Sequence, residues 1–247
     1  MNKMNRYTFG IIYLLVFTII GCASSKNIVK NEEIQISKLV FRFYHSISEE
    51  GERNAQIVKD SLVAHIQKVP GYDPVGLEIM KQSLFTDMVK KNPEKEIHIE
   101  LNQDTIWRYS ATSGKIKGNL YRVDIEKGIL VHYYSKNDKT VYYQTNLFDE
   151  YGDYEIQVFP NDVKELLGYT CHKVIIRKKE QLGEVLPISL GDSIFEMYVT
   201  DKIDLPIHAL LSIGMTKNHS IYFPLEVRRW EEKLAGYQEV YEIKEIN

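Results

Sequence analysis

Hydrophobic and polar residues alternate along most of the chain after residue 34. Alternation with a period of two places hydrophobic side chains on one face of a strand and polar side chains on the other. Turn-forming pairs such as Ser113-Gly114 and Asn137-Asp138 separate the alternating runs at intervals of about ten residues. This spacing favours a meander of short antiparallel strands over parallel strands joined by helices. The clearest alternating positions are Leu39, Phe41, Phe43, Ile97, Ile99, Leu101, Tyr121, Val123 and Ile125.

A helical pattern interrupts this alternation near residues 53–91. Hydrophobic residues recur there at intervals of three and four positions in two stretches, 55–69 and 77–89. Prolines at 70, 74 and 93 separate and close the two stretches, so we expect two helices. Together the patterns predict a mainly β fold with a helical insertion, of the α+β class. Its antiparallel meander forms an open half-barrel, and the two helices cover one face.

The N-terminal segment has the pattern of a signal peptide. Residues 1–7 carry Lys3 and Arg6 but no acid, and residues 9–20 are almost entirely hydrophobic. This run is shorter than the roughly 20 residues that a membrane-spanning helix needs. Residues 19–22, Ile-Ile-Gly-Cys, resemble the lipobox of bacterial lipoproteins, which implies removal of residues 1–21 and attachment of lipid to Cys22. The alternative is a secretory signal beside an incidental cysteine.

Lipid on Cys22 would determine where the protein works. The several acyl chains of a bacterial lipoprotein hold far more firmly than a single chain would. Ala23 stands where lipoproteins retained at the inner membrane of enteric bacteria have Asp. We therefore expect a lipid-anchored protein of the cell envelope, on the outer membrane and facing the periplasm. Residues 22–33 would form a flexible tether and residues 34–247 a single β-rich domain.

Composition limits the partners and the covalent structure. Residues 1–21 hold two of the 31 Lys and Arg residues and none of the 34 acids, so the rest of the chain has a formal charge of −5. This net charge disfavours nucleic acid and anionic lipid as electrostatic partners. Cys22 and Cys171 are the only cysteines in the sequence, so lipid on Cys22 would exclude an internal disulfide.

The last third of the chain contains two motifs, KELLGYTCHK at residues 164–173 and FEMYVTDKIDLP at residues 195–206. They resemble the paired signatures of the GLPGLI family, secreted or lipid-anchored proteins of unknown function found largely in Bacteroidota. The family's namesake string is replaced here by YFPLEV at residues 222–227. Residues 225–246 also look like the closing hairpin of the lipoprotein-carrier half-barrel, which implies a hollow that holds acyl chains. The residues that match the family motifs, with an implied structural role, are Gly168, Cys171, Lys173, Tyr198, Thr200 and Pro206.

Candidate catalytic groups are few. The seven histidines are scattered without an HExxH motif or a helical i, i+4 pair, and the chain has no CxxC or GxSxG motif. Cys171 and His172 are adjacent and would point to opposite faces of a strand, so we expect a buried, inert thiol. The alternatives are a metal site assembled by folding and a hydrolase that uses Cys171 or the acids between residues 192 and 204. We expect no enzyme activity, no cofactor and no metal.

Tyrosine is the most informative excess, with 17 residues. Tyr133-Tyr134 and Tyr142-Tyr143 lie on neighbouring predicted strands, where they would meet across a hairpin closed by Asn137-Asp138. In each pair we expect one ring to face the core and the other to face solvent. Cross-strand packing is the simpler interpretation. The alternative is a groove that binds a protein, a glycan or a lipid.

Three functional hypotheses follow. The first is a non-catalytic lipoprotein of the cell envelope that binds a hydrophobic ligand or a protein segment in a concave β-sheet. The second is a scaffold or accessory subunit of an envelope protein complex, and the third, with less support, is a hydrolase. In the first two the protein is held at the membrane through lipid on Cys22 and binds no nucleic acid. The sequence identifies neither the ligand nor the protein partner.

Overall fold

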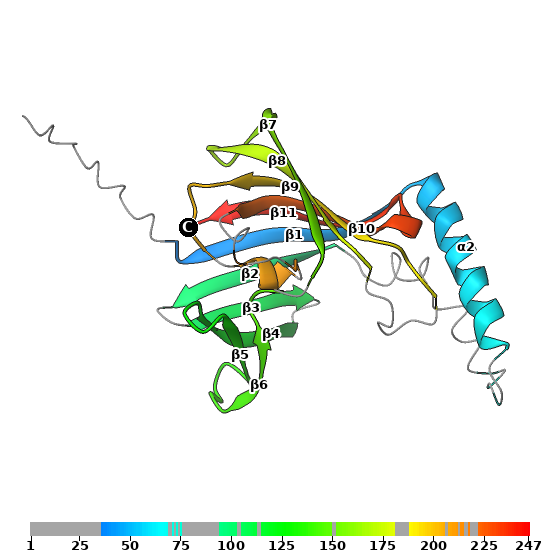
Figure 1. Cartoon of the computed structure of the whole chain (residues 1–247). Helices are drawn as coiled ribbons and strands as arrows, with labels where there is room; N and C mark the ends of the chain where they lie inside the picture. Colours follow the sequence, from blue (N-terminus) through cyan, green and yellow to red (C-terminus); the bar gives the residue numbers. More distant parts are fainter. Residues whose placement is uncertain are drawn as a thin grey trace, which may run out of the picture. The chain divides into compact units, whose positions relative to one another are not determined.

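The computed structural model describes most of residues 36–247, which form one compact unit (Figure 1). The predictions made for residues 1–33, including lipid on Cys22, and for a second helix at 77–89 lie outside the described residues. None of the described helices is long and hydrophobic enough to cross a membrane. The described ranges are 36–68, 71, 73, 75, 94–102, 105–112, 115–149, 152–180, 188–205, 207–211, 213–214, 217 and 222–247.

Within these ranges the chain forms eleven strands, one α-helix and two short 3-10 helices. The order of the elements, with their bounds, is β1 Lys38–Ile47, α2 Glu49–Ile66, β2 Lys95–Asn102, β3 Thr105–Thr112, β4 Lys115–Asp124, β5 Ile129–Tyr133, β6 Val141–Asn146, β7 Tyr154–Leu166, β8 Tyr169–Lys178, β9 Ser193–Thr200, η1 His208–Leu211, β10 Phe223–Glu231, η3 Glu232–Leu234 and β11 Tyr237–Ile246.

All eleven strands belong to one antiparallel sheet, in the order β6-β5-β4-β3-β2-β1-β11-β10-β9-β8-β7. Two meanders, β2–β6 and β7–β11, extend in opposite directions from β1, which pairs with β2 on one side and β11 on the other. The predicted mainly β, antiparallel meander is therefore confirmed. The pairing of β1 with β11, across nearly the whole length of the chain, has no local signal in the sequence.

The sheet must be strongly curved, because a short segment connects its two edge strands. Ten inter-strand gaps separate β6 from β7, which corresponds to about 48 Å in a flat sheet. Only residues 147–153 lie between the two strands, and a fully extended chain of this length reaches about 28 Å. The edges therefore approach each other across one face of the sheet. This face, which carries Leu39, Phe41 and Phe43, is called the inner face below.

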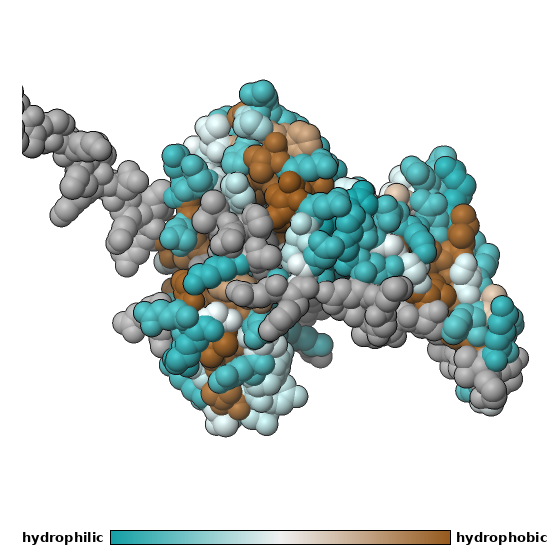
Figure 2. All heavy atoms as spheres, viewed as in Figure 1, coloured by the Kyte–Doolittle hydropathy of each residue, from teal (hydrophilic) through white to brown (hydrophobic). Residues whose placement is uncertain are grey.

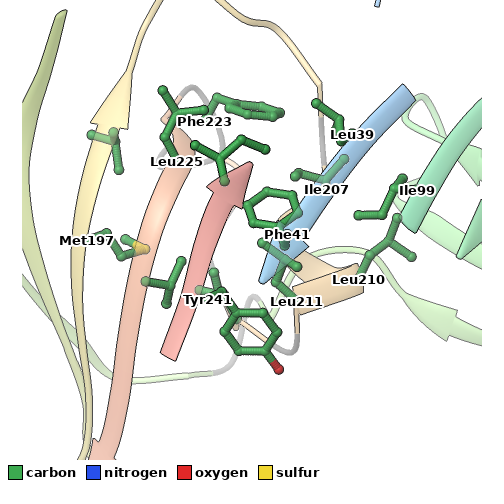
Figure 3. Packing of buried hydrophobic residues seen from close by; sticks show 14 of the residues in the cluster. Leu39, Phe41, Ile99, Met197, Ile207, Leu210, Leu211, Phe223, Leu225 and Tyr241 are labelled. Carbon is green, nitrogen blue, oxygen red and sulfur yellow. The ribbon is translucent and has the colours of Figure 1, made fainter. Parts of the chain in front are cut away.

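The chain itself fills the centre of the inner face. Ile207, Leu210 and Leu211, in and next to η1, are almost completely buried against residues of β1, β2, β9 and β10 (Figure 3). Residues 147 and 148 of the crossing segment belong to the same cluster, and the ring of His208 stacks on Phe148 with centroids 5.7 Å apart. The hollow that the carrier resemblance implied is thus occupied here by η1.

Helix α2 does not cover a face of the sheet, which corrects the predicted arrangement. Its buried residues Ala55 and Val58 pack with Leu234 of η3 and Tyr237 of β11 in a small separate cluster. The helix therefore lies beyond the ends of the central strands, as Figure 1 shows. Hydrophobic positions spaced along a helix indicate that one stripe is buried, but they do not indicate which neighbour buries it.

Candidate functional site

The predicted tyrosine hairpin forms, but its rings are more exposed than expected. Tyr134 contacts Tyr142 with ring centroids 4.7 Å apart, across the β5–β6 hairpin that Asp138 helps to close. Tyr142 and Tyr143 are 60% and 46% exposed, because β6 is an edge strand with all six residues exposed. Tyr143 does point to the inner face, where it stacks on His132, the register partner of Tyr121, but neither ring of β6 is buried. Tyr134, Tyr142 and Tyr143 form an exposed aromatic surface, whereas Tyr133 is half-buried.

The residues of the family-like motifs have structural environments. Gly168 has a φ of +82° in the β7–β8 turn, a conformation that glycine adopts without steric cost. Lys173 on β8 and Tyr198 on β9 are register neighbours on the face opposite the inner face. Lys173 pairs with Glu196 at 2.8 Å, and the Tyr198 hydroxyl donates to Asp162 at 3.0 Å. Thr200 is buried, and Pro206 lies outside the described residues.

Cys171 is fully buried, as predicted. Burial, followed by the nearby charge of Glu165, raises the pKa of its thiol to about 11. The thiolate is the reactive form of cysteine, so this environment suppresses nucleophilic chemistry.

Alkylation of Cys171 by iodoacetamide at pH 8 is expected to be about a hundredfold slower in the native protein than in urea, because both access and thiolate fraction are low. Mass spectrometry of the peptide that contains Cys171 measures this rate separately from Cys22. Equal rates in the two solvents would show that the thiol is accessible.

The acids between residues 192 and 204 do not form a shared catalytic site among the described residues. Asp192 pairs with Arg177 at 3.2 Å and Lys179 at 3.3 Å, while Glu196 pairs with Lys173. Across the described part of the chain, no group of three or more His, Cys, Asp or Glu side chains is arranged to hold a metal ion. The carboxylates of Asp192 and Glu196 are therefore engaged with basic side chains.

Charged residues also point to the inner face, and two of them, Lys95 and Arg229, lie toward the ends of β2 and β10 that are nearer α2. Lys95 lies two residues from buried Ile97 on β2, and Arg229 lies two residues from buried Val227 on β10. Residues two apart on a strand point to the same face, so both cations point to the inner face. Arg108 of β3 is the register partner of buried Ile99, so it also points to the inner face. We call Lys95, Arg108 and Arg229 the inner-face basic cluster.

An aromatic floor lies beneath this cluster. The Lys95 Nζ lies 4.9 Å from the ring centroid of Phe43, and the Arg229 guanidinium carbon lies 5.6 Å from that of Phe195. Phe43 in turn contacts Tyr241 with centroids 4.7 Å apart. Tyr241 stands at the border of the apolar core around η1, with its hydroxyl directed away from the labelled hydrophobic residues in Figure 3. The inner face therefore changes from apolar to basic across one aromatic row.

Glu239 and His45 complete the site. The Glu239 carboxylate lies 3.9 Å from both the His45 Nε2 and the Arg229 Nη1. Its pKa is lowered, chiefly by the contact with His45 and against the effect of burial. Burial and then the charge of Arg108 lower the pKa of Lys95, and burial raises the pKa of Tyr241 to about 12. These mutual effects show that the charges interact across several strands.

Two polar atoms of the site are buried without a hydrogen-bond partner. They are Nδ1 of His45, whose side chain is only 6% exposed, and Nε of Arg108. Buried polar groups are normally hydrogen-bonded, and an unpaired one costs free energy. Solvent still reaches the neighbouring Arg229 and Glu239, whose side chains are 31% and 34% exposed. The site is therefore partly open and its hydrogen-bonding capacity is not fully used.

A second concavity lies beside α2 and has a volume of about 450 Å³. It is lined by Ile57 and Val58 of α2 together with Ile188, Ser189 and Lys233 among others. Figure 2 shows hydrophobic surface on α2 in this region, and Ile57 is 63% exposed. The Lys233 amine already donates to the Ser189 hydroxyl and carbonyl oxygens, at 2.9 and 3.0 Å. This concavity therefore offers a ligand apolar contact but few unused polar groups.

Comparison with known proteins gives a distant structural likeness. The chain matches no protein-family model and no curated protein. Among solved structures it is similar to the lipoprotein LppX of Mycobacterium tuberculosis, with a TM-score of 0.32 and 8% sequence identity over 86% of this chain and 87% of that chain. A likeness this distant says nothing of a ligand or an activity. The resemblance to the GLPGLI family stays a prediction that rests on the motif residues.

Sequence reasoning did not identify the inner-face basic cluster, although a signal for it exists. The next residue in the alternating series Leu39, Phe41, Phe43 is His45. In the same way, Lys95 lies two residues before Ile97 and so belongs to the series of Ile97 and Ile99. A charged or titratable residue at an inward position of a strand is unusual, because desolvation of charge is costly. Reading the alternation beyond its last hydrophobic residue would therefore have indicated a polar site inside the sheet.

Proposed function

We propose that the protein is a non-catalytic binding protein of the cell envelope that holds an amphipathic ligand on the inner face of its curved sheet. Lipid on Cys22 would anchor it at the outer membrane, facing the periplasm. The observation that carries the proposal is the inner-face basic cluster, which lies over an aromatic floor and next to the apolar core. An amphipathic molecule has the matching division between a polar and an apolar part.

The cost of the cluster supports a binding role. Placing like charges such as Lys95 and Arg108 near each other on a partly buried surface destabilises the folded state. A sheet that needed only a core would use hydrophobic residues at these inward positions. Residues that reduce stability without serving packing are typical of binding and catalytic sites.

Access to the aromatic floor is also consistent with binding. Among the described residues, long side chains such as Lys95 and Arg229 lie over Phe43 and Phe195. Such side chains bury their aliphatic stems while keeping the charge near water. They can change rotamer and expose the rings at a lower cost than a packed hydrophobic residue would incur. The apolar part of a ligand would then contact the floor while its polar part stays with the cations.

Native mass spectrometry of the full-length protein, combined with solvent extraction of the same preparation, tests this proposal. We expect a noncovalent passenger of lipid-like mass, present at about one copy per chain and removed by extraction. Protein that carries no passenger, and that takes up none when mixed with an extract of bacterial envelope lipids, would contradict the proposal.

The exposed aromatic surface supports a second function, as a scaffold that contacts another envelope protein. Strand β6 has an unpaired edge, carries no charged residue and exposes Tyr142 and Tyr143. Unprotected edges of this kind pair readily with other chains, and tyrosine is enriched at protein interfaces. A crosslinker placed at position 144 and activated in cells tests this function. A reproducible protein adduct supports it, and its absence from replicate experiments counts against it.

A further inference from the structure

We propose that the ligand of the inner face carries an acidic headgroup, a phosphate or a carboxylate, bound by Lys95 and Arg108 with Arg229 beside them. This inference rests on the proposed function and specifies its ligand class. It also revises the expectation, drawn from the net charge of the chain, that anionic lipid is not a partner. The formal charge of the chain is negative, but Lys95, Arg108 and Arg229 all point to its inner face.

The balance of charges at the site is the first argument. Neither Lys95 nor Arg108 forms an ion pair with a carboxylate in the described part of the chain. Arg229 is the exception, because it lies 3.4 Å from Glu231 and 3.9 Å from Glu239. Two cations of the cluster therefore have no carboxylate within ion-pair distance among the described residues, and an anionic ligand would supply one.

The mutual effect of the cations is the second argument. Burial first, and then the charge of Arg108, lower the pKa of Lys95, while Glu239 acts in the opposite direction; Lys95 and Arg108 both point to the inner face, so their like charges repel each other there. An anion between them would convert this repulsion into two attractions. Glu239 is near Lys95, but its carboxylate is already shared between His45 and Arg229. The site thus favours an acidic group from outside the chain.

The chemistry of the donors is the third argument. A guanidinium presents several N–H donors in a plane, which suits the oxygens of a phosphate or a carboxylate. Nε of Arg108 and Nδ1 of His45 are buried and lack a partner within the described residues. The His45 ring packs edge-on against Phe43, so this unpartnered nitrogen adjoins the aromatic floor, and the unused donor of the site is the Nε of Arg108. Headgroup and apolar contacts therefore lie side by side.

A competition experiment with matched lipids tests the inference on the full-length protein. The protein in nonionic detergent is mixed with equimolar phosphatidic acid and phosphatidylcholine of identical acyl chains, and the two adducts are counted by native mass spectrometry. We expect the acidic adduct to exceed the zwitterionic adduct by about tenfold or more. In a Lys95→Gln/Arg108→Gln double variant the ratio is expected to fall close to one.

Arg122→Gln provides a matched control. Arg122 is a half-buried arginine of β4, adjacent to the inner-facing Tyr121 and therefore on the opposite face, and its Nε also lacks a partner within the described residues. Its loss should leave the lipid ratio unchanged. Thermal unfolding serves as the folding check, and removing either repelling cation is expected to keep or raise the melting temperature.

The possible results separate this inference from the proposed function. Equal binding of both lipids by the unaltered protein would overturn the acidic headgroup but leave the binding function standing. Absence of any adduct, together with absence of a passenger, would overturn both. Competition with inorganic phosphate is the final measurement. If millimolar phosphate displaces the acidic lipid completely, the site recognises the free anion rather than an amphiphile, and the inferred lipid headgroup is wrong.

Discussion

Replacing Leu211 by alanine is expected to lower the free energy of unfolding by about 2–5 kcal/mol. Leu211 is 1% exposed and belongs to the cluster in which η1 fills the inner face. The substitution leaves a cavity next to Phe41, and the curved sheet has little freedom to collapse into it. The total stability of a domain is only about 5–15 kcal/mol, so this single change would remove a large part of it. Urea unfolding followed by circular dichroism measures the loss.

Ile57→Ala is the control for this prediction. Ile57 is a large hydrophobic residue of α2 that is 63% exposed, so its truncation should change the free energy of unfolding by about 0.5 kcal/mol or less. If the Leu211 variant were as stable as the Ile57 variant, η1 would be loosely attached. The inner face would then be an open hollow, as the carrier resemblance implied.

Replacing Gly51 by alanine is expected to dislodge the start of α2. A Cβ at position 51 would lie 2.2 Å from the carbonyl oxygen of Gly236, a backbone atom of the β10–β11 turn. Neither partner can rotate away as a side chain would, so the helix or the turn must move. Overpacking of this kind costs about 1–3 kcal/mol or more. Hydrogen exchange of the α2 amides, together with urea unfolding, measures both the local and the global effect.

Glu52→Ala tests whether the effect is specific to the contact. Glu52 is the exposed neighbour of Gly51 in the first turn, so its replacement removes only a favourable charge near the helix N-terminus. We expect a loss of about 1 kcal/mol or less and unchanged exchange in the rest of α2. Equal stability of the Gly51 variant and the native protein would show that α2 does not rest on the turn at Gly236.

The sequence predicted the local elements well because their signals are local. The period-two alternation at Leu39, Phe41 and Phe43 corresponds to β1, and the turn signal at Asn137-Asp138 corresponds to the β5–β6 hairpin. Burial of Cys171 also followed from its strand context. In each case the decisive contacts lie within a few residues along the chain.

The arrangement of these elements was not predictable in the same way. The pairing of β1 with β11, the packing of residues 147 and 148 in the core and the position of η1 all join segments that are distant in sequence. A four-residue 3-10 helix is too short to show a hydrophobic period. The sequence therefore predicted a curved sheet and assigned its cover to helices, whereas among the described residues η1 and residues 147–148 fill the centre of the inner face.

The candidate site illustrates the same limit. Lys95, Arg108 and Arg229 come from three strands, and only the register of the folded sheet brings them to one face. The tyrosine pairs were conspicuous in the sequence because adjacent aromatic residues stand out. The structure places Tyr142 and Tyr143 at an exposed edge and places the cations Lys95 and Arg229 over aromatic rings of the inner face.

Photocrosslinking from the inner face tests the central claim most directly. Ser110 of β3 is the register partner of buried Ile97 and points to the inner face, whereas Glu96 of β2 points to the opposite face. A photoreactive amino acid is introduced at either position of the full-length protein, and the protein is irradiated in cells before purification. The account predicts a lipid-like adduct at position 110 and none at position 96. An adduct at position 96 alone, or at neither position, would contradict a ligand on the inner face.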